Sequence, residues 1–524
     1  MSERYDVIVV GSGFGGAVTA ARLAEAGARV LVLERGRRWT RDQYPRGFGD
    51  AWRFSQARPH RRNGWLDLRF FSRMIVVQGA GVGGSSLCYS GVTIEPPAGM
   101  FDARWPPEIT SDELRPYYDR VERMLNVRPI PAGQQTARGS LLEQAAARLG
   151  YADRVARVPL AISFDDDWSY RLAEPLDVRH SKERVNEHGQ RQGTCVHLGN
   201  CDIGCDVGAK NSLDFNYIPL AERHGAEVRP LHVVRNVQPE ERGGFQVTFD
   251  RIEQRRLIPG SARASKVVLA AGSLGTTELL LRCRDQFRSL PAVSSRLGLG
   301  WSPNGNVMAL DRHRDARQVQ QGIGPAISAG LDFTDGLRTG QRFYIEDDGF
   351  PNVLHHVLRK ARRPWSWLWR PSPHRAPDER NPAGHFMLWM GIGVDASDGK
   401  LRLGRRRLAP WRTSLDLRWR AGSSRALVEA IVSMQRALSG ASDGRILLLP
   451  GWRRLASLVS VHPLGGCGMG GTAAAGVVDH RGAVFGYPNL FVADGAILPG
   501  AVGRNPSLTI GALAERIADL MIKD

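Results

Sequence analysis

The chain has 524 residues, of which 42% are hydrophobic and 24% are charged, so it has enough apolar material for a large core. This composition excludes a mostly disordered chain. No run of residues approaches the roughly 18 uncharged apolar residues that a transmembrane helix needs. The N-terminal residues have neither the basic segment nor the cleavage site of a secretory signal, which predicts a cytoplasmic protein.

The net charge is +18, from 71 Lys and Arg against 53 Asp and Glu. Only six of the 71 cationic residues are lysines, and the arginines are spread over the whole chain. Because the excess of arginine is dispersed along the chain, it favours the interpretation of a compositional bias over that of a binding patch for an anionic partner. Contact with a membrane surface or an acidic substrate is the second interpretation. No motif indicates nucleic-acid binding.

The N-terminal segment has the pattern of a dinucleotide-binding βαβ unit. Residues 5–10 (Tyr-Asp-Val-Ile-Val-Val) are typical of a buried strand and lead into residues 11–16, Gly-Ser-Gly-Phe-Gly-Gly. We expect a helix over residues 17–26 and a second strand over residues 29–33 that ends at Glu34. Strand, glycine motif, helix and terminal acid are in register, which indicates nucleotide binding more specifically than the glycines alone.

Each residue type in this unit has a physical role. Gly11 permits a tight turn, and Gly13 lets the backbone approach a pyrophosphate. Gly16 allows the helix to pack closely on the strand, and the helix N-terminus offers free N–H groups to phosphates. Glu34 can accept hydrogen bonds from ribose hydroxyls. The motif alone leaves open whether the nucleotide is FAD or NAD.

Further glycine-rich segments extend this domain. Residues 78–86 (Gln-Gly-Ala-Gly-Val-Gly-Gly-Ser-Ser) predict a loop with close backbone approach to a ligand. Residues 266–275 repeat the strand and glycine turn before a helix over residues 276–282, and residues 227–234 predict a short strand. The nucleotide-binding domain is therefore discontinuous. Runs between its pieces, such as residues 386–394, suit a mixed or antiparallel sheet.

Residues 359–371 interleave three tryptophans, Trp365, Trp367 and Trp369, with five cationic side chains. A loop whose tryptophans fold back into the core is one interpretation. Peripheral contact with a membrane surface is the other, because tryptophan and arginine both suit a lipid–water interface.

Three of the six cysteines, Cys195, Cys201 and Cys205, lie close together in the sequence. Their spacing is not that of a paired Cys-x-x-Cys metal site, and a fourth ligand is not evident. We expect packing or a local disulfide, and no metal.

Two motifs near the C-terminus indicate chemistry. His462 stands before the sequence Pro-Leu-Gly-Gly, and a predicted strand ends at Asp494. An amphipathic helix is expected over residues 507–521, with Pro506 at its first position and Asn505 as its N-cap. Backbone N–H groups at this helix start can face an anionic or carbonyl-bearing ring.

Together these motifs resemble the glucose–methanol–choline (GMC) oxidoreductase family, and within it the cholesterol-oxidase-like branch. The resemblance covers nearly the whole chain. It depends on residues 11–16 with Glu34, residues 78–86 followed by Glu95-Pro96, residues 300–306 (Gly-Trp-Ser-Pro-Asn-Gly-Asn), residues 462–466, Asp494-Gly495 and Asn505-Pro506.

The resemblance implies an α/β fold, in which a Rossmann-like FAD-binding domain is joined to a discontinuous α+β substrate-binding domain on a mixed or antiparallel sheet. The FAD-binding domain is expected to comprise residues 1–45, 74–96, 228–310 and 462–524. The substrate-binding domain is expected to comprise residues 46–73, 97–227 and 311–461.

The resemblance also implies FAD as the cofactor and a set of residues that bind it. These are Gly11, Gly13, Phe14, Gly15, Gly16, Glu34, Arg35, Gly79, Gly81, Gly83, Gly84, Ser85, Tyr89, Ser90, Gly91, Val234, Ala271, Gly272, Asp494, Gly495, Asn505 and Pro506. His462 and Asn505 are expected to face the flavin as catalytic residues. Glu346 is the candidate proton shuttle of the substrate-binding domain, and the adjacent Asp347 and Asp348 leave that assignment open.

The implied reaction is oxidation of the CH–OH group of a bulky hydrophobic alcohol, sterol-like or long-chain, to a ketone or aldehyde. The resemblance implies that hydride passes to flavin N5 and that oxygen or a quinone accepts the electrons. His462 has a pKa suited to a general base. One alternative is different chemistry on the same fold, as a fatty-acid photodecarboxylase or a double-bond isomerase. Another is a lipid-binding protein that holds FAD without turnover. The oligomeric state stays open.

Overall fold

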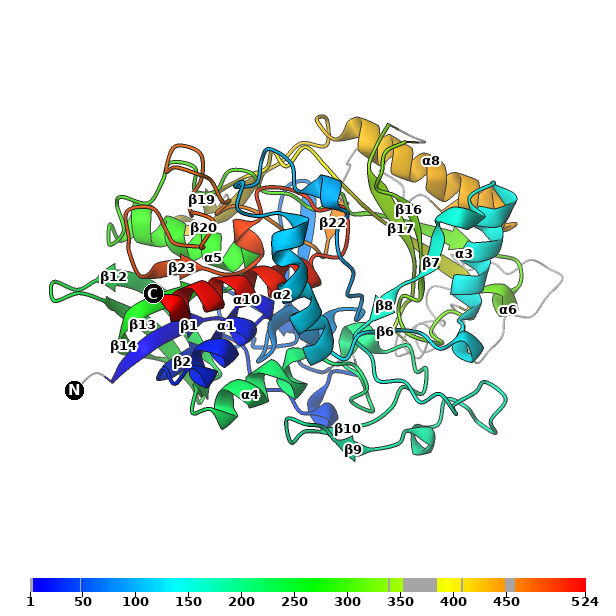
Figure 1. Ribbon diagram of the computed structural model, residues 1–524, viewed down its shortest axis with the longest axis horizontal. Coiled ribbons are helices and arrows are strands. Elements are labelled where there is room, and N and C mark those ends of the chain that lie inside the picture. Colours follow the sequence, from blue (N-terminus) through cyan, green and yellow to red (C-terminus); the bar gives the residue numbers. More distant parts are fainter. Residues whose placement is uncertain (1–2, 48, 338–339, 352–383, 407–408, 448–457) are drawn as a thin grey trace.

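A computed structural model describes residues 3–47, 49–337, 340–351, 384–406, 409–447 and 458–524 (Figure 1). A seven-stranded sheet lies near the two termini, and a six-stranded sheet lies at the opposite end of the molecule. The three tryptophans Trp365, Trp367 and Trp369 lie outside the described residues. No helix in the described part of the chain is long and apolar enough to cross a bilayer.

The seven-stranded sheet has the order β11-β2-β1-β14-β13-β12, with β23 also paired to β14. Its strands are β1 (Arg4–Val10), β2 (Val30–Leu33), β11 (Glu227–Arg229), β12 (His232–Pro239), β13 (Phe245–Glu253), β14 (Arg256–Leu269) and β23 (Leu490–Val492). β11, β2, β1, β14 and β23 pair in parallel, while β12 and β13 form an antiparallel extension. This is the sheet of a Rossmann-like domain.

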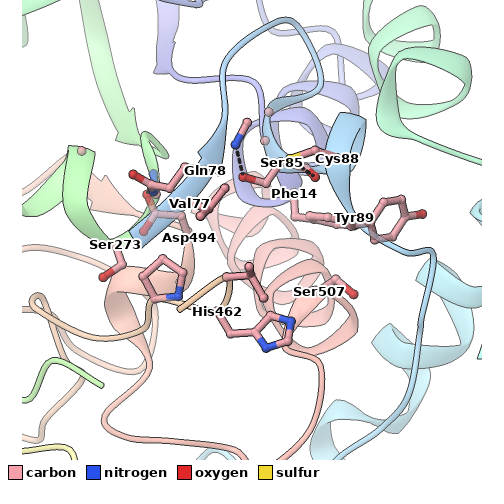
Figure 2. A pocket seen from close by; sticks show the side chains of 18 of the residues that line it. Phe14, Val77, Gln78, Ser85, Cys88, Tyr89, Ser273, His462, Asp494 and Ser507 are labelled. Carbon is pink, nitrogen blue, oxygen red and sulfur yellow. Dashed lines mark hydrogen bonds between the residues drawn. The ribbon is translucent and has the colours of Figure 1, made fainter. Parts of the chain in front are cut away.

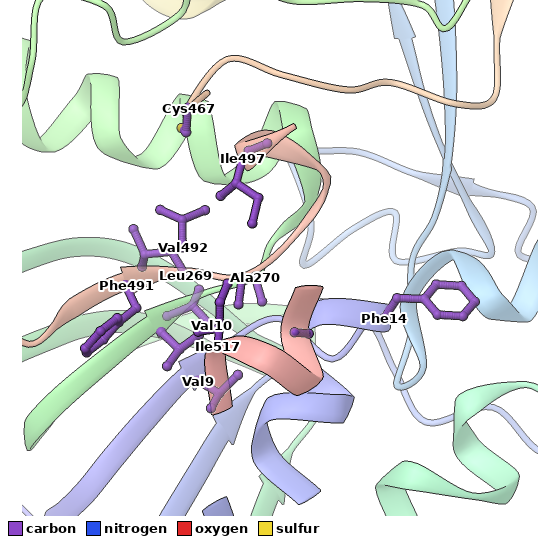
Figure 3. Packing of buried hydrophobic residues seen from close by; sticks show 14 of the residues in the cluster. Val9, Val10, Phe14, Leu269, Ala270, Cys467, Phe491, Val492, Ile497 and Ile517 are labelled. Carbon is purple, nitrogen blue, oxygen red and sulfur yellow. The ribbon is translucent and has the colours of Figure 1, made fainter. Parts of the chain in front are cut away.

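Helices pack on the parallel part of this sheet and on one another. They are α1 (Phe14–Glu25), α2 (Ser111–Met124), α4 (Tyr217–Arg223), α5 (Gly272–Leu281) and α10 (Ser507–Lys523). α10 packs against α1 and α2. Figure 3 shows Ile517 of α10 beside Val10, Leu269 and Val492 of three parallel strands. All four side chains are almost completely buried, so the two ends of the sequence share one core.

Two local predictions from the sequence are wrong. Residues 227–234 form two strands instead of one, because Pro230 has no N–H to continue the ladder and Leu231 has a left-handed φ of 61°. Asn505 does not cap α10, whose N-cap position is Pro506 and has no side-chain hydrogen bond. The Asn505 amide is turned toward Glu346 instead.

The six-stranded sheet has the order β21-β15-β18-β17-β16-β7, and every pairing in it is antiparallel. Its strands are β7 (Val155–Arg157), β15 (Val307–Arg312), β16 (Ala329–Phe333), β17 (Phe343–Asp348), β18 (Phe386–Gly393) and β21 (Arg445–Leu447). One face packs on α3 (Ala137–Arg148) and α8 (Arg425–Ala441). The expected antiparallel sheet of the second domain is confirmed, although the residue boundaries of the two domains stay a prediction.

A smaller sheet, β22-β5-β4-β3, connects the two regions. Its strands are β3 (Arg53–Phe54), β4 (Leu66–Phe70), β5 (Met74–Gly79) and β22 (Leu458–Ser460). β22 lies parallel to β5, so the chain just before His462 is fixed beside the strand that enters the second glycine-rich loop.

The remaining short elements are β6 (Arg128–Pro129), β8 (Pro159–Leu160), β9 (Arg184–Val185), β10 (Arg191–Gln192), α6 (Ala316–Val319) and the hairpin of β19 (Lys400–Arg406) and β20 (Ala409–Arg418).

Candidate active site

A cavity of about 540 Å³ is lined by residues of both main sheets. One end is formed by the glycine-rich loops, and we call it the nucleotide end. The other end is formed by β15, β17 and β18 together with His462, and we call it the reaction chamber. Figure 2 shows Gln78, Ser85 and Cys88 on one side of the cavity and His462 with Ser507 on the opposite side.

Glycines at the nucleotide end let backbone segments approach one another. A Cβ atom on Gly15 would lie 1.7 Å from the carbonyl oxygen of Ala493, and one on Gly11 would lie 2.4 Å from that of Ala270. Gly13 differs, because the nearest atom to a Cβ there is the Cα of Gly84 at 3.9 Å. The space beside Gly13 is therefore open, and Gly13 lines the cavity.

The start of α1 has the properties of a phosphate-binding site. Its N-cap, Gly13, offers no side chain to the helix, and its first turn contains no acidic residue. Free N–H groups and the helix dipole at such a terminus favour an anion. The open space beside Gly13 and these N–H groups fit the pyrophosphate of FAD.

Glu34 supports the first glycine loop as well as lining the cavity. Its Oε2 accepts hydrogen bonds from the Ser12 N–H (3.1 Å) and hydroxyl (2.8 Å), and its Oε1 accepts one from the Gly36 N–H (2.8 Å). A carboxylate offers about four acceptor positions. One therefore remains for a ribose hydroxyl, which fits the role predicted from the sequence.

Asp494 ties the third glycine turn to the start of the C-terminal segment. Its Oδ2 accepts from the Gly272 N–H (2.7 Å) and the Thr276 hydroxyl (2.6 Å), and its Oδ1 accepts from the Ala496 N–H (2.7 Å). Burial raises the pKa of Asp494 to about 6, against the effect of these hydrogen bonds.

Most of the residues predicted to bind the cofactor line the cavity. These are Gly11, Gly13, Phe14, Gly15, Glu34, Arg35, Gly79, Gly84, Ser85, Tyr89, Ser90, Val234, Ala271, Gly272, Asp494, Gly495, Asn505 and Pro506. Four others, Gly16, Gly81, Gly83 and Gly91, are not among the lining residues. Gly16 instead allows close packing, because a Cβ there would lie 2.1 Å from the Gly11 carbonyl oxygen.

His462 is held by Asn306, a residue for which the sequence alone indicates no role. Asn306 Oδ1 accepts a hydrogen bond from the Val461 N–H (3.0 Å), so its Nδ2 faces His462 Nδ1 at 3.1 Å. An amide nitrogen only donates, so Nδ1 accepts and the neutral ring carries its proton on Nε2. Burial lowers the pKa of His462 to about 4, which keeps the ring neutral at pH 7.

Asn304, two residues earlier, fixes the segment that leads to Asn505. Its Oδ1 accepts from the Val502 and Gly503 N–H groups (3.0 and 3.1 Å), and its Nδ2 donates to the Arg504 carbonyl (2.8 Å). The motif of residues 300–306 therefore holds both His462 and the Asn505 segment. In the sequence this motif supports the family resemblance, but its positioning role becomes evident only in the folded chain.

Strand alternation decides which of the three neighbouring acids face the chamber. Glu346 and Asp348 lie on one face of β17 and line the cavity. Asp347 lies on the other face, where its carboxylate accepts from the Ser328 and Ala329 N–H groups, both at 2.7 Å. Asp347 is therefore part of the framework of the sheet.

Glu346 and Asn505 meet inside the chamber. Asn505 Nδ2 donates to Glu346 Oε2 over 3.4 Å, while Glu346 Oε1 and Asn505 Oδ1 are buried and have no hydrogen-bond partner among the described residues. Burial raises the pKa of Glu346 to about 8. When Glu346 is ionised, these two oxygens are unpartnered acceptors at one place, which fits a ligand that donates hydrogen bonds.

The cysteine cluster takes no part in this site. Its three members are free thiols, so the expected local disulfide is absent, and they pack with Val92 and Trp168. Cys195 Sγ accepts from the His197 N–H (3.4 Å), and Cys205 Sγ accepts from the Ala209 N–H (3.2 Å). Within the described ranges no group of three or more His, Cys, Asp or Glu residues could hold a metal ion.

Known proteins resemble the chain in sequence and in fold. Residues 395–514 match the GMC oxidoreductase family, and residues 9–41 match the NAD(P)-binding Rossmann-like domain family. A cholesterol oxidase of Mycobacterium tuberculosis is 28% identical over 99% of this chain and 91% of its own length. The paromamine 6'-oxidase of Streptomyces fradiae is also 28% identical, over 99% of this chain and 92% of its own length.

Among solved structures, a formate oxidase variant of Aspergillus oryzae RIB40, studied for its FAD modification, superposes with a TM-score of 0.67 at 14% identity. The superposition covers 100% of this chain and 98% of that one. This likeness supports the fold, while the sequence matches and the geometry of the cavity support the chemistry. Residues 395–514 are thus of the GMC oxidoreductase type, and the chain, similar to cholesterol oxidases over nearly its whole length, is an FAD-dependent enzyme of the alcohol oxidase and dehydrogenase type.

Proposed function

We propose that the chain oxidises the CH–OH group of a bulky, largely apolar alcohol to a carbonyl. The observation that carries this proposal is the wall of the reaction chamber. Met308, Leu388 and Met390 lie on the cavity face of the six-stranded sheet, beside the polar group of His462 and Asn505. Such a surface stabilises an apolar body by about 25 cal/mol per Å² removed from water.

The polar side chains of the chamber have different roles toward the alcohol hydroxyl group. His462 donates a hydrogen bond from Nε2 and holds the oxygen, because Asn306 keeps the ring proton on that nitrogen. Glu346, in its ionised form, takes the hydroxyl proton on the unpartnered Oε1. Asn505 orients Glu346 through its amide. This arrangement replaces the expected role of His462 as the base with that of a hydrogen-bond donor.

The glycine loops and Glu34 would hold FAD, which when bound would supply the two-electron acceptor for the hydrogen on carbon. The C–H and O–H bonds of the alcohol break and a C=O bond forms, with the proton retained on Glu346. Oxygen in an oxidase, or a quinone in a dehydrogenase, would be the final electron acceptor. Positioning the carbinol carbon is the main task of the chamber walls.

A carboxylate substrate is disfavoured by the same geometry. Glu346, Asp348 and Asp202 all line the cavity, and the arginines that line it among the described residues, Arg35, Arg235 and Arg282, belong to the nucleotide end. A fatty-acid carboxylate would meet carboxyl groups in the chamber. This charge pattern favours alcohol oxidation over light-driven decarboxylation.

The test is anaerobic stopped-flow absorbance of the FAD-loaded protein with sterols, long-chain alcohols and sugars. We expect apolar alcohols to bleach the oxidised flavin band and sugars to leave it unchanged. Admitting air, or a quinone without air, then identifies the electron acceptor by which of them restores the band. The proposal fails if FAD is bound and no apolar alcohol bleaches it.

A further inference from the structure

Two carboxyl groups in the chamber are not used by the proposed reaction. Asp348 follows Glu346 on the cavity face of β17, and Asp202 reaches the same cavity from the short helix over Cys201–Ile203. Asp202 Oδ1 accepts from the Ser90 hydroxyl (2.9 Å), and Asp348 Oδ1 accepts from the Gly349 N–H (2.8 Å). Neither carboxyl forms an ion pair among the described residues, although the chain has a net charge of +18.

Among the described residues, the cationic side chains near these two carboxyl groups, Lys210 and Arg138, form hydrogen bonds with other groups. The ammonium group of Lys210 donates to the carbonyl oxygens of Leu87 (2.8 Å), Tyr89 (2.9 Å) and Cys201 (2.6 Å). Arg138 likewise donates to four backbone carbonyl oxygens, those of Ile323, Pro325, Ala326 and Asp347. Neither side chain lines the cavity, so both leave the two carboxyl groups open to a ligand.

Burial raises the pKa of Asp348 well above its ordinary value, and the nearby Asp202 and Glu346 raise it further. A buried carboxylate without a partner is costly, and a cation beside it removes that cost. The unpartnered oxygens of Glu346 and Asn505, whose residues are 0% and 7% exposed, add two more acceptors to the same space. In their ionised forms these carboxyl groups, together with the Asn505 carbonyl oxygen, offer only hydrogen-bond acceptors, and a bound cation favours the ionised forms.

We infer that the alcohol oxidised here carries a protonated amine, which Asp348 and Asp202 bind while its hydroxyl lies between His462 and Glu346. This inference rests on the proposed alcohol oxidation and narrows its substrate class to apolar amino alcohols. Side chains two residues apart on one face of a strand lie about 7 Å apart. The ammonium and hydroxyl groups of a good substrate are therefore separated by a similar distance.

The test compares straight-chain alkanols with the same alkanols bearing a terminal amine, over a range of chain lengths, on the FAD-loaded enzyme. We expect kcat/KM at pH 7 to favour the amino alcohol by about tenfold or more at the best length, as for a charge-assisted hydrogen bond. In Asp348→Asn and Asp202→Asn the ratio of kcat/KM for the amino alcohol to kcat/KM for the neutral alcohol should fall toward one. Asn keeps the oxygen that accepts from Gly349 or Ser90.

Asp167→Asn is the matched control, since it removes the same charge from a side chain that is 87% exposed. It should keep the wild-type preference. A second measurement does not depend on catalysis: the rise in Tm that alkylamines without a hydroxyl group cause when they bind. Their binding should protect the wild type and the Asp167→Asn variant, and should fail to protect Asp348→Asn.

The outcomes separate the two proposals. Equal rates for neutral and amino alcohols in the wild type, with no protection by alkylamines, overturn the amine inference and leave alcohol oxidation standing. A loss of kcat in Asp348→Asn that is the same for both alcohol series also overturns it, because it assigns the acid pair to proton transfer. Absence of flavin reduction by any alcohol overturns the proposed function itself. The preference of the wild type for amino alcohols is measured without any variant, so the inference can be contradicted even if a variant misfolds.

Discussion

The two ends of the cavity are built by different means. The nucleotide end is formed by backbone, where Gly11 and Gly15 leave no room for a Cβ atom. The reaction chamber is formed by side chains on one face of an antiparallel sheet, where alternate residues face the cavity. A side-chain surface can be changed without moving the chain, whereas a backbone contact cannot. The comparison predicts a rigid cofactor site beside a chamber whose specificity is open to change.

The largest expected effect comes from Gly15→Ala. The new Cβ would lie 1.7 Å from the Ala493 carbonyl oxygen, so β23 or α1 must shift. We expect the free energy of unfolding to fall by about 3 kcal/mol or more, and FAD binding to be lost. Gly13→Ala is the matched control, because its Cβ has 3.9 Å of space and its φ is −72°.

Thermal unfolding and the ratio of flavin to protein absorbance distinguish the two glycine variants. Gly13→Ala should keep the Tm of the apoprotein near that of the wild type and still lose FAD, because its Cβ fills the space expected for the pyrophosphate. Normal FAD content in Gly13→Ala would contradict the assignment of the nucleotide end.

Replacing His462 by Ala tests the reaction chamber without touching the backbone contacts. We expect FAD to stay bound and the rate of flavin reduction to fall by about 10²–10⁴-fold. Asn306→Asp is a sharper variant, because a carboxylate still accepts from Val461 N–H but draws the ring proton to Nδ1. Flavin reduction should then slow, with His462 still present. A wild-type rate in Asn306→Asp would contradict the placement of the ring proton on Nε2 of His462.

The pH profile tests Glu346. Its pKa is raised to about 8 by burial, so the carboxyl is mostly protonated at pH 7 and ionises as the pH rises through 8. If the ionised form takes the hydroxyl proton, kcat/KM rises with pH and levels off above about 8. Glu346→Gln should be slower by about 10²-fold and lack this rise. A wild-type profile that falls through pH 8 would show that the protonated form is needed.

The same contrast explains what the sequence could predict. Glycine motifs reflect constraints on the backbone, so the Rossmann-like sheet, a dinucleotide cofactor and the lining role of residues such as Gly13 and Gly84 follow from local patterns. The choice of FAD over NAD came from the family resemblance. The chamber depends on contacts between distant residues. Asn306 and His462 are 156 positions apart, and no local pattern links them.

Some of the missed information was present in the sequence. The ambiguity among Glu346, Asp347 and Asp348 disappears once residues 343–348 are read as a strand, because alternate residues then share a face. The prediction that Asn505 caps the helix was wrong, and the reason is different. Its side chain can form either a local cap or a contact with Glu346, and only the folded chain brings Glu346 close enough to compete.

The smallest expected effect comes from shortening one chamber side chain. Met390 lines the cavity, whereas Met387, on the other face of β18, packs in the core beneath α3 and α8. Met390→Ala should lower kcat/KM for apolar alcohols by about tenfold, the loss of about 1–2 kcal/mol of apolar contact with the substrate, and leave FAD content unchanged. Met387→Ala should instead lower the free energy of unfolding by about 2–5 kcal/mol and keep the order of preference among alcohols.

Steady-state kinetics with a homologous alcohol series measures the preference, and denaturant unfolding measures the stability. If Met387→Ala altered the order of preference and Met390→Ala did not, the two faces of the sheet would not have the separate roles that alternation gives them.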